Sequence, residues 1–432
     1  MRFSRLKKTI GLILTLFATA GPAWPQPAGL PDVLRMALEH NPEIAAARED
    51  IRASEGDAAL ADAAALPYLY AGNSYTYLSK ATVFGGQEVF KKTTNIQSLG
   101  LRQSIWDESL NRSRRAAGRA VTAREHHGAA VEEMVLFTVA ERFWQVGAAR
   151  EYVVAAEDSV TFLEANLKSV EAGRQAGIAT RGDVLRAEAE LALARDRLIS
   201  ARNGELLALA GLKAAIGLGQ DHDLEVVTTQ MDPDPAILEV EAGESPVVLA
   251  ARSAVESRSH ALAGARAGSL PKVTLEADYL NISQGAEFPR TDGSASAMVR
   301  VSIPIFDGGM TRAASLKAGA ELNRSEKELE NALLQTQLQR KTAELALASA
   351  RERYLATEKQ VESAMESRRL TEIGFREGVN TQTDLLAAQS AVTMAQASRI
   401  QSLTDLKTAE AAYLTAISRL DTILNTGKEK LP

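Results

Sequence analysis

Cysteine is absent from the 432-residue sequence. Disulfides, thiolate nucleophiles, cysteine metal sites and an acylated N-terminal cysteine are therefore all excluded. Long apolar runs are also missing beyond residue 23, whereas a membrane-spanning helix needs about 20 consecutive apolar residues. If the exported chain crosses a membrane, it must consequently do so with β-strands.

An excess of positive charge is lacking too. The formal net charge is −6, so nothing favours nucleic acid as a partner. The sequence contains no glycine-rich phosphate loop, nucleophile elbow or paired metal-ligand spacing. We therefore expect no enzyme, no cofactor and no bound metal, and assign no catalytic role to the five histidines: His40, His126, His127, His222 and His260.

Residues 1–23 predict a secretory signal peptide. Four basic residues lie within the first eight positions, and a short apolar stretch covers residues 10–20. Small-residue cleavage sites follow at Ala18-Thr19-Ala20 and Gly21-Pro22-Ala23. A transmembrane anchor is the alternative, but the apolar run is shorter than a membrane span. We therefore expect export from the cytoplasm.

The chain repeats itself at a shift of about 200 residues. Segment 41–67 matches 245–271, Ile105-Trp106-Asp107 matches Ile305-Phe306-Asp307, and 173–187 matches 374–388. We predict a first structural repeat over 24–220, a linker over 221–245, a second repeat over 246–424 and a tail over 425–432. Each repeat is expected to contain a helix, two strands, a long helix, a turn and another helix.

Proline is absent from 68–232 and from 305–431, which permits very long helices. A helix over 108–172 would be ~95 Å long at ~1.5 Å per residue. The second repeat predicts helices over 310–372 and 384–424. Apolar residues recur at spacings of three, four and seven, which is typical of coiled-coil hairpins with closely packed helices. One seam is Val153, Val160, Leu163, Leu167 and Val170, facing Leu191, Ala194, Leu198 and Ala201.

Strands are predicted within 67–107 and 271–307, where apolar and polar residues alternate. Ten of the 21 aromatic residues gather in these two segments, as in the girdles of membrane barrels. A water-soluble sheet with one buried face would show the same alternation; the export signal and long helices favour the membrane. The charged residues of the polar face, expected to line a barrel lumen, are Arg102, Lys272, Glu276, Asp278 and Arg300.

Four strands per chain cannot close a barrel, because small barrels need about eight. Unpaired strand edges are not viable in lipid. The strands must therefore be pooled between chains, giving eight strands in a dimer or twelve in a trimer.

At these motifs the sequence resembles the TolC-type outer-membrane factor family. Segment 34–43 resembles its N-terminal segment, and 176–185 and 377–386 resemble its two periplasmic hairpin tips. The resemblance implies a homotrimer with a twelve-stranded barrel in outer-membrane lipid and a helical periplasmic tunnel. It also implies docking on a periplasmic adaptor that is joined to an inner-membrane pump.

The resemblance implies a gate at the periplasmic tips. Asp183 and Asp384 match its acidic positions, and Phe375 falls where some members have tyrosine. Asn380 and Ala387 depart from the pattern, standing where some members have an arginine and a second aspartate. The resemblance therefore does not carry the charge pairing of the gate over to this chain.

The two tips also predict adaptor contacts. Gly177 and Gly378 supply the backbone freedom of a tight turn, and Ile178 and Val379 would be exposed apolar residues that favour a partner. Thr180-x-x-Asp183 and Thr381-x-x-Asp384 predict helix-capping boxes. Capping and gating are compatible, and capping is the simpler interpretation of these short motifs.

The predicted function is passive conduction of small molecules such as drugs through a tripartite efflux system of a Gram-negative outer membrane. An exit duct of a type I protein secretion system is the alternative within the same class. Outside it stand a periplasmic helical-hairpin adaptor and a trimeric stalk or adhesin. An adaptor would lack duplicated strand pairs, and a stalk would need no matched turns at two tips.

Overall fold

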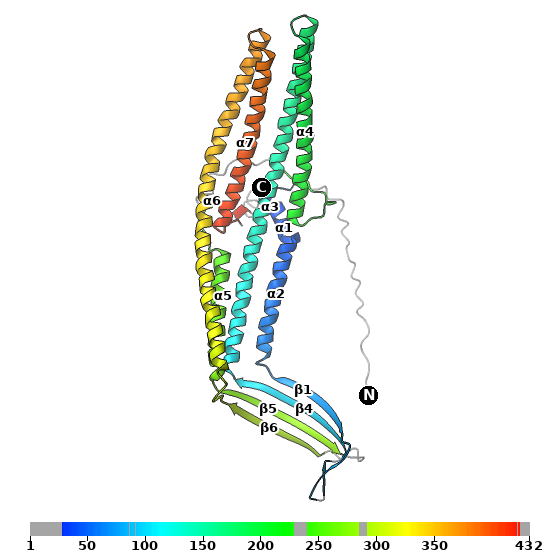
Figure 1. Cartoon of the computed structure of the whole chain (residues 1–432), viewed down its shortest axis with the longest axis vertical. Helices are drawn as coiled ribbons and strands as arrows, with labels where there is room; N and C mark the ends of the chain where they lie inside the picture. The colour runs from blue at the N-terminus through cyan, green and yellow to red at the C-terminus, as the bar shows by residue number, and fades with distance from the viewer. Residues whose placement is uncertain are drawn as a thin grey trace, which may run out of the picture.

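The computed structural model describes residues 28–85, 87–90, 92–228, 240–284, 292–420 and 422–423. The predicted signal peptide and the tail over 425–432 lie outside these residues. Figure 1 shows an elongated molecule, with helical hairpins at one end and a curved sheet at the other. The prediction of a mainly helical chain with a small sheet is confirmed.

The described elements follow the chain in this order: α1 Leu30–His40, α2 Pro42–Ala63, β1 Tyr68–Tyr77, β2 Thr82–Phe84, β3 Gln87–Phe90, β4 Thr93–Trp106, α3 Glu108–Gln175, α4 Arg181–Ile216, α5 Pro246–Arg266, a 3-10 turn Ala267–Ser269, β5 Lys272–Gln284, β6 Asp292–Ser302, α6 Met310–Arg376 and α7 Gln382–Ala416. Each half therefore contains a helix, a strand pair and a long helical hairpin. The small β2–β3 hairpin within the first half was not foreseen.

The long helices begin at two equivalent aspartates. Asp107 is the N-cap of α3, where its Oδ1 accepts the Leu110 N–H at 3.1 Å. Asp307 accepts the N–H groups of Gly309 and Thr311 at 2.9 and 2.8 Å before α6. The duplicated aromatic-Asp motif thus satisfies free donors at both helix starts. None of the helices in the described ranges is long and apolar enough to cross a membrane.

Two elements end earlier than the sequence predicts. Helix α7 was expected to reach residue 424 but ends at Ala416, because Ser418 adopts φ +53° and Gly243 N–H bonds the Ile417 carbonyl at 2.7 Å. Strand β6 ends at Ser302, ahead of the expected residue 305. Pro304 has no N–H to donate to a ladder.

The main core lies at mid-height of the helical part. It is formed where α1, α3, α4 and α7 meet, and its fully buried members include Leu34, Phe143, Leu212 and Leu406. A second, smaller cluster between α3 and α4 contains Leu163, Leu191 and Ala194. These three residues belong to the predicted coiled-coil seam, which is therefore confirmed as a buried contact in this half.

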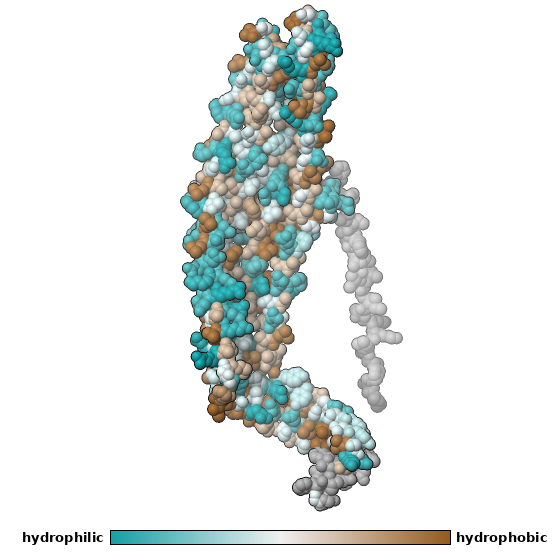
Figure 2. All heavy atoms as spheres, viewed as in Figure 1, coloured by the Kyte–Doolittle hydropathy of each residue, from teal (hydrophilic) through white to brown (hydrophobic). Residues whose placement is uncertain are grey.

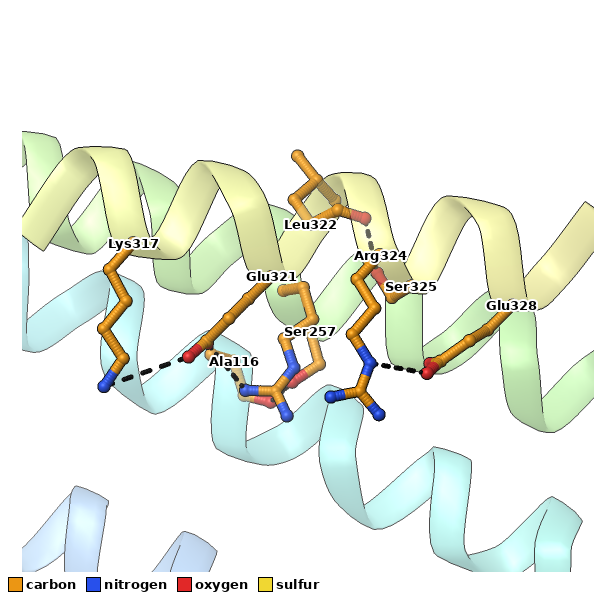
Figure 3. A network of polar contacts seen from close by, with 9 residues as sticks. Ala116, Ser257, Lys317, Glu321, Leu322, Arg324, Ser325 and Glu328 are labelled. Atoms are coloured by element: carbon orange, nitrogen blue, oxygen red, sulfur yellow. Dashed lines mark hydrogen bonds and ion pairs between the residues drawn. The ribbon is translucent and has the colours of Figure 1, made fainter.

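Helix α5 lies between α3 and α6. The Ser257 hydroxyl donates to the Ala116 carbonyl of α3 at 2.8 Å, and Arg258 pairs with Glu321 of α6 at 3.3 Å. Figure 3 shows Ser257, Ala116 and Glu321 together at this crossing. These contacts join α3 and α6 in their sheet-proximal halves (Figure 1). Both long helices come directly after a strand pair in the chain.

The sheet has the order β1-β4-β5-β6 with all neighbours antiparallel. In the first half β1 pairs with β4, in the second half β5 pairs with β6, and β4 joins β5 across the two halves. Strands β1 and β6 stand at the edges, so each presents one side without a partner among the described strands.

Candidate functional site

The five charged strand residues predicted from the alternation lie on one face of the sheet. Arg102 is paired with Glu276 across β4 and β5, and Arg300 stands opposite Thr274 across β5 and β6. The Glu276 carboxylate reaches Arg102 at 3.5 Å and Arg300 at 3.3 Å, so it bridges three strands. Near the helices, Lys272 pairs with Asp107 at 3.0 Å. The polar face therefore carries both signs of charge in paired form.

The opposite face of the sheet is apolar over its helix-proximal part. The register places side by side Val273 with Val301, Leu275 with Val299, and Leu101 with Ala277 and Ala297. The β6 members Ala297, Val299 and Val301 are exposed, Val299 at 63%, whereas their β5 neighbours are half-buried. Figure 2 shows apolar groups gathered on the sheet and at its junction with the helices. A face of this kind needs an apolar environment.

Tyr70 packs across the polar face. Its hydroxyl donates to Asp278 Oδ1 at 2.9 Å, spanning β4. It can do so because the residue between them is Gly100, where an added Cβ would lie 2.3 Å from the Tyr70 ring. The aromatic residues of β1 are therefore divided between faces: Tyr70 lies on the charged face, and Tyr75 on the apolar one. The sequence analysis groups both tyrosines with the aromatic girdles of a barrel and does not separate the two faces.

Gly100→Val should destabilise the sheet. The new side chain would displace the Tyr70 ring and break its bond to Asp278, and overpacking of this kind costs about 1–3 kcal/mol. We expect a lower midpoint of thermal unfolding than for Gly72→Val, because a Cβ at residue 72 meets only the Ser98 hydroxyl. Equal midpoints for the two variants would contradict this account.

The first hairpin tip is a glycine turn followed by a capping box. Gly177 has φ +78°, and the Ile178 N–H returns to the Gly173 carbonyl at 2.8 Å. Thr180 is the N-cap of α4: its Oγ1 accepts the Asp183 N–H at 3.2 Å, while Asp183 Oδ2 accepts the Thr180 N–H at 2.9 Å. The Ile178 side chain takes no part in the turn and is 86% exposed.

The second tip repeats this geometry. Gly378 has φ +76°, the Val379 N–H returns to Gly374 at 2.8 Å, and Val379 is 77% exposed. Thr381 and Asp384 form the same reciprocal cap, with the carboxylate 2.9 Å from the Thr381 N. Phe375 is half-buried in the last turn of α6. The geometry of both tips therefore confirms the predicted helix-capping boxes.

Capping perturbs both tip carboxyls. The hydroxyl and N–H of Thr180 lower the pKa of Asp183, and Thr381 lowers the pKa of Asp384 in the same way. These hydrogen bonds stabilise the ionised form. Both residues lie at the surface of the tips, so each tip presents a charged carboxylate at neutral pH.

Two contacts at the tips were missed from the sequence. Arg186 of α4 donates to the Thr383 hydroxyl of α7 at 2.6 Å, and Gln382 Nε2 donates to the Asp183 carbonyl at 3.4 Å. Both contacts join residues almost 200 positions apart, so no local sequence motif predicts them. They place the starts of α4 and α7 next to each other. No group of histidine and acidic side chains able to hold a metal occurs among the described residues.

Comparison with known proteins gives a family for this architecture. The model of the family described as outer membrane efflux protein matches residues 33–218 and 238–418. The alkaline protease secretion protein AprF of Pseudomonas aeruginosa is 26% identical over 408 residues, 91% of this chain and 83% of that protein. The outer membrane efflux protein BepC of Brucella suis is 23% identical over 437 residues, 97% and 92% of the two chains.

A solved structure supports the fold. The outer membrane protein VceC of Vibrio cholerae superposes with a TM-score of 0.77 at 18% identity, covering 90% of this chain and 95% of that one. Family members are outer-membrane channels that form trimers and work with periplasmic adaptors and inner-membrane pumps. Because the family model covers both halves, the chain belongs to the outer membrane efflux protein family and is a Gram-negative outer-membrane channel of an efflux or type I secretion system, with a long periplasmic portion.

Proposed function

We propose that three copies of this chain form one closed, passive conduit that binds no cofactor and catalyses no reaction. The unpaired sides of β1 and β6 carry this proposal. Each chain supplies four strands to the sheet, fewer than a barrel requires. Joining β6 of one copy to β1 of the next would remove every free edge, and three copies would give twelve strands facing outer-membrane lipid.

The helical part supports the same arrangement. Contacts between its long helices run in the order α4, α3, α7, α6, so α4 and α6 form the two lateral edges (Figure 1). Both edges carry exposed apolar residues at heptad-like spacing, namely Ile199 and Leu206 on α4 and Leu334, Leu338, Leu345 and Leu355 on α6. Contact between these two different edges would be head-to-tail, and such a contact closes into a ring when the rotation between copies is one-third of a turn.

The mature protein should therefore be an obligate trimer in detergent. Native mass measurement of the purified protein checks this directly. A stable, folded monomer would contradict both the pooled sheet and the helical ring. In a single copy the sheet edges β1 and β6 and the helical edges α4 and α6 would have no partner from another copy.

Val299→Arg should impair assembly in the outer membrane, while Arg300→Val should be tolerated. Val299 lies on the apolar face, where an arginine at the middle of a bilayer costs ~2–4 kcal/mol. Arg300 lies on the face proposed to line the lumen with Arg102, Lys272, Glu276 and Asp278. Quantifying trimer in the outer-membrane fraction compares the two variants, and the reverse order would refute the facing assignment.

The tips form the proposed periplasmic end of the conduit. We assign Asp183, Asp384 and Phe375 to a gate, since both hairpins end in an acidic cap and threefold symmetry would bring six carboxylates together. We assign adaptor contact to the exposed turns, which comprise Gly177, Ile178, Thr180, Gly378, Val379 and Thr381. The inner-membrane pump would supply the energy through that adaptor.

We further propose exported polypeptides as the cargo. The relative at 26% identity is named for the secretion of a protease, and it matches over nearly the whole chain. Small-molecule efflux is the second candidate, favoured by the family's description and by the name of BepC. A water-filled tunnel of this fold serves either cargo, because the partner pump selects the substrate.

Deletion of the gene followed by two measurements separates these cargoes. Loss of one or more proteins from the culture supernatant, with unchanged drug susceptibility, supports polypeptide export. Increased susceptibility to drugs with an unchanged set of secreted proteins overturns the polypeptide proposal in favour of efflux.

A further inference from the structure

A groove runs between the two helical hairpins, on the tip side of the main core. It is lined by α3, α4 and α7, because α4 and α7 both pack on α3 (Figure 1). Its volume is about 320 Å³, which lies within the range of small-ligand pockets in proteins. Six of its eleven lining residues are alanine and one is glycine. The groove is therefore open because the side chains that line it are short.

The short side chains are specific to this part of the chain and do not follow from the duplication. At the shift of 201 residues, Ser159 corresponds to Gln360 and Gly204 corresponds to Asp405. The equivalent positions of the second hairpin thus carry longer, polar side chains. Packing within a hairpin therefore does not itself require the short ones.

The tip-proximal part of the groove offers two polar groups without partners. Ser159 is the lining residue of α3 nearest the tip; it is only 7% exposed and makes no hydrogen bond with a described residue. An unpaired buried hydroxyl costs free energy, which a ligand that accepts its hydrogen bond recovers. Arg197 of α4 is exposed and makes no ion pair or hydrogen bond with a described residue. A ligand with a negatively charged oxygen would satisfy both groups.

The core-proximal part of the groove is apolar. Ala149 and Ala201 present only methyl groups, and the Tyr152 hydroxyl already donates to the Ala397 carbonyl at 3.2 Å. An added Cβ on Gly204 would meet no other group within 4 Å, so this part is open space. The groove thus has a polar end toward the tip and an apolar end toward the core, which matches a ligand with an anionic head and an alkyl chain.

We propose that the groove binds a single-chain anionic amphiphile, namely a medium-chain carboxylate of about ten carbons. The Ser159 hydroxyl donates to the carboxylate, Arg197 supplies the opposite charge, and the alkyl chain lies along the alanines toward Gly204. At roughly 30 Å³ per methylene, close to the volume of a water molecule in the liquid, 320 Å³ holds one such chain and not the two chains of a phospholipid. The site lies within one chain and depends on neither the proposed cargo nor the proposed gate.

Decanoate binding to the full-length protein, reconstituted as trimers in lipid nanodiscs, tests this site, with empty nanodiscs as the blank. Arg197→Gln removes the cation, and Gly204→Leu fills the apolar end of the groove without a clash. Two matched controls lie outside the groove. Arg181→Gln removes another exposed arginine of α4, and Gly118→Leu alters a helical glycine of α3 with the same free space around it. A photoreactive decanoate, mapped by mass spectrometry of the peptides, locates the bound chain.

We expect isothermal titration to give at least tenfold weaker decanoate binding in Arg197→Gln and Gly204→Leu, with the parental affinity in both controls. Affinity should rise about two- to fourfold for each methylene from hexanoate to decanoate, because each one buries more apolar surface, and then level off. The photoreactive chain should attach to α3, α4 and α7 around the groove and be displaced by excess decanoate. Parental affinity in both groove variants, or attachment confined to the sheet, overturns the site. Decanol bound as tightly as decanoate also overturns it, because the anionic head would then contribute nothing.

Discussion

Replacing Ile178 and Val379 together with aspartate should abolish export while the trimer remains intact in the outer membrane. Each residue follows the turn glycine, and its N–H is consumed by the turn, at 2.8 Å from Gly173 or Gly374. The side chains contribute nothing to that turn and are almost fully exposed. Six such apolar groups at the end of a trimer would form the docking surface that we propose for the adaptor.

A charged group in the centre of that interface would have to lose its water without gaining a partner. We expect adaptor binding to weaken by at least tenfold, where each factor of ten corresponds to ~1.4 kcal/mol. Affinity for the purified adaptor and export from intact cells are the two measurements. Gln175→Asp is the control for each single substitution, because it adds one negative charge at an exposed position of the tip without removing an apolar side chain. Full export by the double variant would rule out these turns as the contact.

The architecture could be predicted because it depends on local rules repeated twice. Two long segments without proline became α3 and α6, and the aspartates at 107 and 307 start them. The Gly-x-x-Thr-x-x-Asp turns fold as the sequence implies, since each uses bonds between residues at most a few positions apart. The face shared by Arg102 and Glu276 follows from the two-residue period of strands, which needs no knowledge of register.

What could not be predicted depends on contacts between distant segments. The division of Tyr70 and Tyr75 between faces follows from the alternation of β1, but the bond from Tyr70 to Asp278 requires β4 to lie between them and to offer Gly100. The end of α7 is set by Gly243, which lies within the predicted linker. Arg186 meets Thr383 only because the hairpins stand side by side. Each depends on register between elements, which periodicity alone leaves open.

The second large effect that we expect is on conductance, through the negative charge at the proposed periplasmic gate. Multivalent cations added from the periplasmic side should reduce conductance in planar bilayers, because six carboxylates from Asp183 and Asp384 would repel one another and a cation relieves that repulsion. Asp183→Asn with Asp384→Asn should remove the block. The double variant should fold normally, since an amide oxygen can still accept the N–H of Thr180 or Thr381, as glutamine does in the capping box.

The pH dependence of this block separates charge from capping. The hydroxyl groups of Thr180 and Thr381 lower the pKa of the two carboxyls in each chain, whereas repulsion among six grouped carboxylates raises the pKa. A carboxyl with a lowered pKa stabilises the folded turn above its ordinary range, and that stability is lost only as the pH falls through the folded-state pKa. Cation block should therefore be lost as the pH falls through the pKa of the grouped carboxyls, and the Asn double variant should show no such pH dependence. If the folded Asn double variant is blocked as strongly as the parent at neutral pH, these carboxylates cap the helices and do not form the constriction.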